Sequence, residues 1–169
     1  MAVKAKPIAI IGFMGCGKST VGRMVANELQ VPFADLDSET ENLSGCRVPQ
    51  LFEEQGELAL RRYESLALSR VAPNGGVLAT SGGCIMLPQN RRALRQGFKV
   101  IFLDVPFNVI MPRIDGTSRP LLKTMNRNEL RRLCELRRPL YQETADITLD
   151  GTKSVDDLTY EIVNLAYED

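Results

Sequence analysis

PIAIIGFMGCGKST occupies residues 7–20 and sets the architecture of the whole chain. Its first five residues are apolar, which is typical of a parallel β-strand covered on both faces. The segment then matches GxxxxGK[ST], a pattern whose glycines let the backbone turn tightly and aim N–H groups at phosphate oxygens. Residues 18–30 continue with apolar side chains at helical spacing, from Val21 to Leu29. A strand, a glycine-rich turn and a helix in this order predict a phosphate-binding loop (P-loop).

The residue types in this loop predict separate tasks. Lys18 would reach the β- and γ-phosphates of a bound nucleotide, and the Ser19 hydroxyl would bind Mg²⁺. The helix that begins here would add the positive end of its dipole. Cys16 is expected to be a small loop residue and not a nucleophile. ATP and Mg²⁺ are therefore the expected cofactors. The predicted ATP-binding residues of the loop are Gly12, Gly15, Cys16, Gly17, Lys18, Ser19 and Thr20.

Beyond the loop, strand patterns alternate with helix patterns. Besides the first strand, apolar runs predict strands ending near Asp35 and at residues 77–80, 99–103 and 147–149. Helical patterns cover residues 18–30, 48–54, 57–71, 89–96, 128–144 and 154–167, and a further helix begins near Pro106. Ser154 is the predicted N-cap of the last helix, with Asp157 as its partner. This alternation predicts an α/β fold of three layers, in which a five-stranded parallel sheet carries helices on both faces.

Residues 115–126 show no periodicity and contain Gly, Ser, Pro and Asn. We interpret this segment as a mobile lid on a P-loop NTPase fold. We see no internal repeat and no linker, so residues 1–169 are expected to form a single P-loop kinase domain.

Composition argues against several other classes of protein. Lys plus Arg and Asp plus Glu both number 21, so net charge gives no reason to expect a nucleic-acid or membrane partner. No apolar run approaches the roughly 20 residues that cross a bilayer. The four cysteines form no CxxC pair and the chain has no histidine, which argues against a zinc site and against Ser-His catalysis. We therefore expect a cytoplasmic, monomeric protein with reduced thiols that acts on a small molecule.

Polar residues follow the second and third predicted strands, where open α/β sheets bind ligands. Asp35 and Asp37 could divide the work between a metal's water shell and a substrate hydroxyl, and Arg61 offers a planar fork to a carboxylate or phosphate. The adjacent Gly82 and Gly83 would let a ligand approach the backbone closely. Each feature also has an ordinary explanation. Aspartates often cap helices, Gly-Gly often forms a turn, and an arginine can pair with glutamates on its own helix.

Four further segments follow the loop in order: FADLD at residues 33–37, GELALRRYE at 56–64, RPLL at 119–122, and Arg137 with Tyr141. Together with the loop, they resemble the motifs of the shikimate kinases, a family of P-loop small-molecule kinases, at close to that family's spacing. The resemblance spans residues 8–145. Many kinases share the P-loop, whereas the combination of the other motifs is far more specific.

This resemblance implies ATP-dependent phosphorylation of the 3-hydroxyl of shikimate. Asp37 would hold the shikimate hydroxyls and assist deprotonation of the one that attacks. Arg61 and Arg137 would clamp the carboxylate, with Glu64 orienting Arg61. The backbone N–H groups of Gly82 and Gly83 would contact the substrate.

On the phosphate side, the resemblance implies that Ser19 and Asp35 serve magnesium. Arg119, on the lid, would close over the phosphates and offset the charge of the transition state. The implied catalytic residues are therefore Lys18, Asp37 and Arg119.

The sequence also departs from the family pattern. Ser81 stands where the family has the first of three glycines, and it could distort the turn if that position required a positive φ. The spacing from Arg113 to Arg119 is one residue short, so an adenine contact at Arg113 stays open. Two alternatives also stay open. One is a related kinase acting on gluconate or a nucleoside monophosphate, and the other is a non-catalytic nucleotide-binding module.

Overall fold

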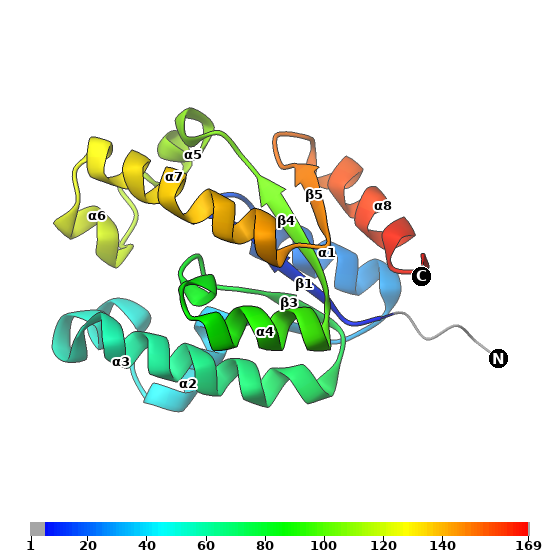
Figure 1. Ribbon diagram of the computed structural model, residues 1–169, viewed down its shortest axis with the longest axis horizontal. Helices are drawn as coiled ribbons and strands as arrows, with labels where there is room; N and C mark the ends of the chain where they lie inside the picture. The colour runs from blue at the N-terminus through cyan, green and yellow to red at the C-terminus, as the bar shows by residue number, and fades with distance from the viewer. Residues whose placement is uncertain (1–5, 169) are drawn as a thin grey trace.

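A sheet of five parallel strands forms the centre of the computed structural model, which describes residues 6–168 (Figure 1). The strands lie in the order β2-β3-β1-β4-β5, and their pairings are parallel. All four residues of the central strand β1 are buried, which explains its continuous apolar sequence. The strands are β1 (Ile8–Ile11), β2 (Phe33–Asp35), β3 (Val77–Ala79), β4 (Lys99–Asp104) and β5 (Ile147–Asp150).

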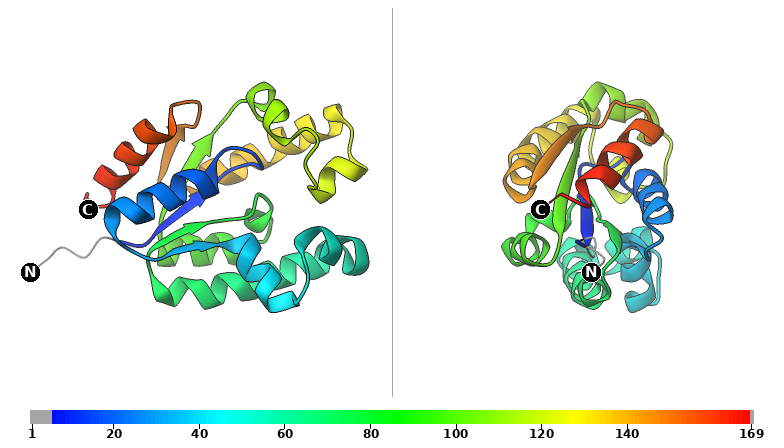
Figure 2. Two further views of the ribbon diagram at one scale, coloured as in Figure 1. Left: turned by 180° about the vertical axis from the view of Figure 1, so that it is seen from behind. Right: turned by 90° about the vertical axis from the view of Figure 1, so that its right-hand side faces the viewer.

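Helices cover both faces of this sheet, which confirms the predicted three-layer α/β fold. Helices α1 (Lys18–Leu29) and α8 (Val155–Leu165) pack together on one face, as Figure 2 shows. Helices α4 (Pro88–Gly97) and α7 (Arg127–Thr144) lie on the opposite face, and α3 (Val48–Val71) packs beside α4. Ser154 caps α8 by accepting a hydrogen bond from the Asp157 N–H, as predicted.

The remaining helices are shorter. They are α2 (Leu36–Ser44), α5 (Phe107–Ile114) and α6 (Pro120–Thr124), with 3₁₀ turns at Ala72–Asn74 and Cys84–Met86. The two helices predicted at residues 48–54 and 57–71 form α3. It is interrupted where Gly56 adopts φ 81° and ψ 177°, so the prediction of two helical segments is confirmed.

Two segments differ from the sequence-based expectation. Helix α2 was not predicted, because only Leu36 and Thr40 are buried in it and its apolar pattern is weak. The segment at residues 115–126, expected to be irregular, contains the five-residue helix α6. Pro120 starts this helix, which packs against α3, but five residues are too few for a periodic pattern. The mobility of this segment as a lid stays a prediction.

Because the strands are parallel, their carboxyl ends meet at one edge of the sheet. The P-loop follows β1 there, Asp35 ends β2, and the turn at residues 80–83 follows β3. Within residues 6–168, none of the helices combines the length and the apolar character that crossing a bilayer requires. All four cysteines are free thiols.

Candidate active site

The P-loop wraps around the ammonium group of Lys18. Gly15 and Gly17 adopt φ values of 76° and 99°, and Gly17 caps the N-terminus of α1. The buried Lys18 side chain curls back, and its Nζ donates to the carbonyl oxygens of Gly12 at 2.9 Å and Phe13 at 3.0 Å. Its charge therefore stays inside the loop, where the backbone N–H groups and the α1 dipole also favour anions.

A cavity of about 420 Å³ lies next to this loop. It brings together the P-loop residues from Gly15 to Thr20 with three predicted residues from distant segments, namely Asp37, Gly82 and Arg119. Arg61, Gly83 and Arg137 do not line it; Arg137 lies beside Gly82, and Arg61 lies beside Gly83. Thus the cavity joins the predicted phosphate site to the Asp37 and Gly82 part of the predicted acceptor site, and the two arginines lie outside its lining.

Ser19 and Asp35 place two oxygen atoms beside each other. The Ser19 hydroxyl donates to Asp35 Oδ2 at 2.5 Å, while Asp35 Oδ1 accepts the Asp37 N–H at 3.0 Å and so caps α2. The capping explanation and the metal explanation thus apply to the same carboxylate. Hydroxyl and carboxylate oxygens are ligands that Mg²⁺ prefers, usually through one or two side chains plus substrate phosphates. No group of three or more His, Cys, Asp or Glu side chains at metal-binding distance occurs in residues 6–168.

Asp37 has an acid strength that differs from that of an ordinary aspartate. Its side chain keeps an exposed surface, but it stands in the cleft, where surrounding protein atoms displace water. This loss of solvation, followed by the negative charge of Asp35, raises the pKa of Asp37 to about 6, although Lys18 and Arg119 act in the opposite direction. A carboxylate with this pKa can accept a proton near neutral pH.

Arg61 is held from both sides by acidic residues. Its Nη1 donates to both Glu64 oxygens, at 2.8 and 2.7 Å, and its Nη2 donates to Glu57 at 3.2 Å. Burial opposes the charge of Arg61, but the Glu64 carboxylate and then Glu57 raise its pKa. The pairing within the helix and the predicted orienting role of Glu64 therefore coincide.

Arg137 is buried without such a partner. Only 2% of its surface is exposed, none of the ion pairs within residues 6–168 includes it, and its Nε atom has no hydrogen-bond acceptor. Its guanidinium lies over the Phe13 ring, 5.8 Å from the centroid. Burial lowers the pKa of Arg137; Tyr141 raises it, and the positive charge of Arg61 lowers it further. A buried cation in this state favours an anionic ligand.

Gly83 makes room for the guanidinium group of Arg61. A Cβ atom on Gly83 would overlap this group, whereas one on Gly82 would lie at an ordinary contact distance of 3.7 Å from Arg137 Nη1 and closer, at 3.2 Å, to the Met14 nitrogen. The Tyr141 hydroxyl holds this turn by donating to the Gly82 carbonyl oxygen at 2.5 Å. Glycine is therefore needed at position 83 because the Arg61 side chain packs against the backbone there.

Arg119 and Arg113 reach the same cleft from the lid side. Arg119 lines the cavity, and its buried Nε atom has no hydrogen-bond partner. Arg113 also lines the cavity and donates to the Gly15 carbonyl oxygen at 3.2 Å. The sequence reading missed Gly151 and Lys153, which line the cleft after β5. No motif marks these two residues, and only the place of β5 in the sheet brings them there.

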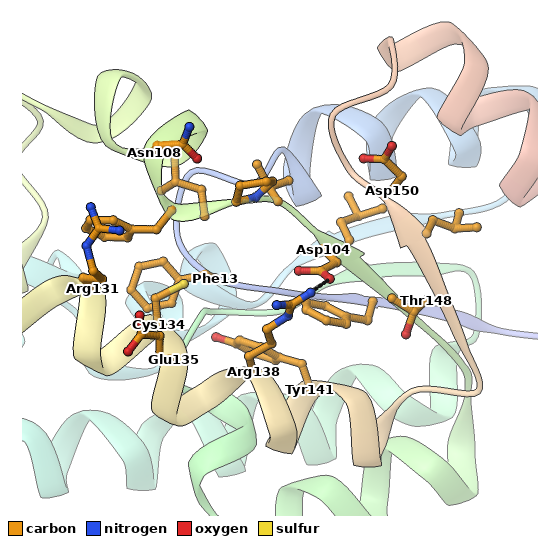
Figure 3. A pocket seen from close by; sticks show the side chains of 17 residues that line it. Phe13, Asp104, Asn108, Arg131, Cys134, Glu135, Arg138, Tyr141, Thr148 and Asp150 are labelled. Atoms are coloured by element: carbon orange, nitrogen blue, oxygen red, sulfur yellow. Dashed lines mark hydrogen bonds and ion pairs between the residues drawn. The ribbon is translucent and has the colours of Figure 1, made fainter.

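A larger cavity, of about 540 Å³, lies between β4, β5 and α7 (Figure 3). None of the predicted site residues lines it. Its cations are already engaged, because Arg138 pairs with Asp104 and Arg131 lies over the Phe107 ring, 4.9 Å from the centroid. Of the arginines on α7, Arg137 is buried, whereas the others are exposed, namely Arg127, Arg131, Arg132 and Arg138. The smaller cavity beside Lys18 is therefore the candidate active site.

Comparisons with known proteins agree with this geometry. A model of the shikimate kinase family matches residues 14–166. A shikimate kinase of Pseudomonas fluorescens is 40% identical over 146 residues, covering 85% of each chain, and one of Aromatoleum aromaticum is 42% identical over 147 residues, covering 85% of this chain and 84% of its own. The solved structure of the Acinetobacter baumannii shikimate kinase in complex with shikimate has a TM-score of 0.90 at 37% identity, covering 95% of this chain and 92% of that one. The chain therefore belongs to the shikimate kinase family.

Proposed function

We propose that this chain transfers the terminal phosphate of ATP to the 3-hydroxyl of shikimate, yielding shikimate 3-phosphate and ADP. Membership of the family supports the use of ATP and the kinase activity. The observation that carries the proposal is the buried Arg137 guanidinium, which has no anionic partner within residues 6–168 and lies beside Gly82 at the edge of the cleft.

The carboxylate of shikimate suits this position. The Nη1 atom of Arg61 donates to the buried Glu64 carboxylate, and its Nη2 atom donates to the half-exposed Glu57 carboxylate. The two guanidiniums pack against adjacent glycines, so a planar carboxylate can bridge them, with the backbone N–H groups of Gly82 and Gly83 nearby. Because the site is buried, an anion there would face little competition from water.

The reaction needs positioning and charge neutralisation more than covalent chemistry. Asp37 would accept the proton of the 3-hydroxyl as its oxygen attacks the γ-phosphorus, and ADP would leave with the pair of electrons of the broken P–O bond. Lys18 would turn from the loop carbonyls to the β- and γ-phosphates. Arg119, unpaired at the lid, would neutralise charge on the transferring group.

Ser19 and Asp35 would hold Mg²⁺, which would neutralise negative charge on the phosphates. The contact between the two side chains supports this proposal, since it already places two hard oxygen atoms at the phosphate end of the cleft. The remaining P-loop residues, Gly12, Gly15, Cys16, Gly17 and Thr20, would surround the phosphates.

The alternatives are less well supported. The matching family model and relatives are shikimate kinases, so a gluconate or nucleoside-monophosphate kinase is not favoured. A non-catalytic nucleotide-binding module is not favoured for the same reason. The monomeric state, the cytoplasmic location and the absence of nucleic-acid or membrane partners stay predictions.

The direct test is ADP release by the purified chain with ATP and Mg²⁺, with and without shikimate, followed by ³¹P NMR of the product. We expect ADP release that depends on shikimate and a phosphate ester at its 3-hydroxyl. Gluconate and a nucleoside monophosphate serve as comparison acceptors. Turnover of either, with none of shikimate, would replace the proposed substrate.

A further inference from the structure

The carboxylate of Glu64 has a second partner besides Arg61. It is 1% exposed, and the hydroxyl of Ser81, in the turn after β3, lies 2.6 Å from its Oε1 atom. Paired with an arginine, this carboxylate is ionised and can only accept, so the Ser81 hydroxyl must donate. Ser81 directly precedes Gly82 and Gly83 in this turn. Within residues 6–168, Gln30 is the one non-glycine residue with positive φ, so serine sits at this turn without strain.

The contact restricts a part of the site that Arg61 alone leaves free. Both Glu64 oxygens accept from the same Arg61 atom, Nη1, so that pairing by itself permits the carboxylate to rotate around it. The other contact of Arg61 is to Glu57, whose side chain is 53% exposed and weakly placed. Ser81 ties one Glu64 oxygen to the turn that also carries Gly82 and Gly83.

We infer that Ser81 is a positioning residue for the substrate carboxylate: through Glu64 it fixes the Arg61 guanidinium against Gly83. The inference rests on the proposed function for the identity of the substrate. It gives the Ser81 hydroxyl a role, which a residue without a hydroxyl could not fill. Ser81 itself does not line the cavity beside Lys18.

The first test is the steady-state kinetics of Ser81→Ala. We expect the KM for shikimate to rise about three- to tenfold, in the range of one typical net hydrogen bond, because Ser81 acts on the substrate only through Glu64 and Arg61. The KM for ATP and kcat should stay within about twofold, because the P-loop and Asp37 are untouched. The matched control is Ser69→Ala. It removes an exposed hydroxyl that donates to a carbonyl oxygen of α3, the helix that also carries Glu64. A kcat loss at unchanged KM, as from partial misfolding, would overturn the inference.

The second test asks whether the effect passes through Glu64. On a Glu64→Gln background, the charged acceptor is gone, so adding Ser81→Ala should raise the KM for shikimate by less than about twofold. An equal rise on both backgrounds would mean that Ser81 acts by another route and would overturn the inference.

Failure of the proposed function would look different. If the parent chain released no ADP with shikimate, urea unfolding would test whether the hydrogen bond from Ser81 to Glu64 stabilises the site. Ser81→Ala should then raise the unfolding equilibrium constant at least about fivefold, and Ser69→Ala less than about twofold. Equal small changes in the two variants would overturn the positioning role.

Discussion

Replacing Arg137 with methionine should leave the protein as stable as the parent while removing most of its use of shikimate. The guanidinium is 2% exposed, its Nε atom is unsatisfied, and it forms no ion pair within residues 6–168. Burial lowers its pKa, which means that folding works against its charge. Methionine fills a similar volume without a charge and adapts to irregular space.

The magnitudes follow from these contacts. Replacing buried charges with apolar side chains of similar volume is often neutral or stabilising, by about 1 to 4 kcal/mol. The lost contact with the Phe13 ring offsets about 2 kcal/mol of that gain, because the pair is desolvated. We therefore expect a change in unfolding free energy between about −2 and +2 kcal/mol. Loss of charge-assisted hydrogen bonds worth about 1.5–3 kcal/mol should raise the KM for shikimate about 10- to 150-fold.

Arg61→Met supplies the contrast. It would leave the Glu64 carboxylate, 1% exposed, without its cation. Breaking a buried pair in this way costs about 3–5 kcal/mol. Urea unfolding of the parent and both variants, alongside a coupled ADP assay, measures both quantities. If Arg137→Met were destabilised as much as Arg61→Met, or kept the parent's KM for shikimate, the reasoning about an unpaired cation awaiting an anion would be refuted.

Three more substitutions test the rest of the site. Asp37→Asn should lower kcat by about 10² to 10⁴-fold, as expected for a lost general base, and retention of kcat would exclude that role. Arg119→Ala should lower kcat at least about 10²-fold in the same assay with an unchanged melting temperature, because Arg119 makes no ion pair within residues 6–168. Gly83→Ala should cost about 1–3 kcal/mol in urea unfolding and raise the KM for shikimate, because its methyl overlaps Arg61. Gly97→Ala, where a Cβ meets nothing within 4 Å, should change the unfolding free energy by less than about 1 kcal/mol, and equal effects at the two glycines would contradict the overlap.

Some features of the site follow from short sequence motifs, and others depend on contacts between distant segments. Arg137 was expected to point inward from the R-x-x-x-Y motif, and its burial confirms this. The contact of Ser81 with Glu64 was not expected, because the serine looked only like a possible distortion of a glycine turn. Asp35 had two competing interpretations, helix cap and metal ligand, and its two oxygens allow both. A sequence pattern does not show which side chains meet across a sheet edge.

By itself, the sequence determined the alternation of strands and helices, the three-layer parallel sheet and the P-loop between β1 and α1. These depend on apolar periodicity and on glycine spacing, which act within a few residues of the chain. Tertiary structure alone decided that Arg61 of α3 and Arg137 of α7 lie against neighbouring glycines, and that one of them has a carboxylate partner while the other lacks one. Which charge is paired depends on how helices from distant parts of the chain pack around one edge of the sheet. A local sequence pattern carries no information about the distances between such helices.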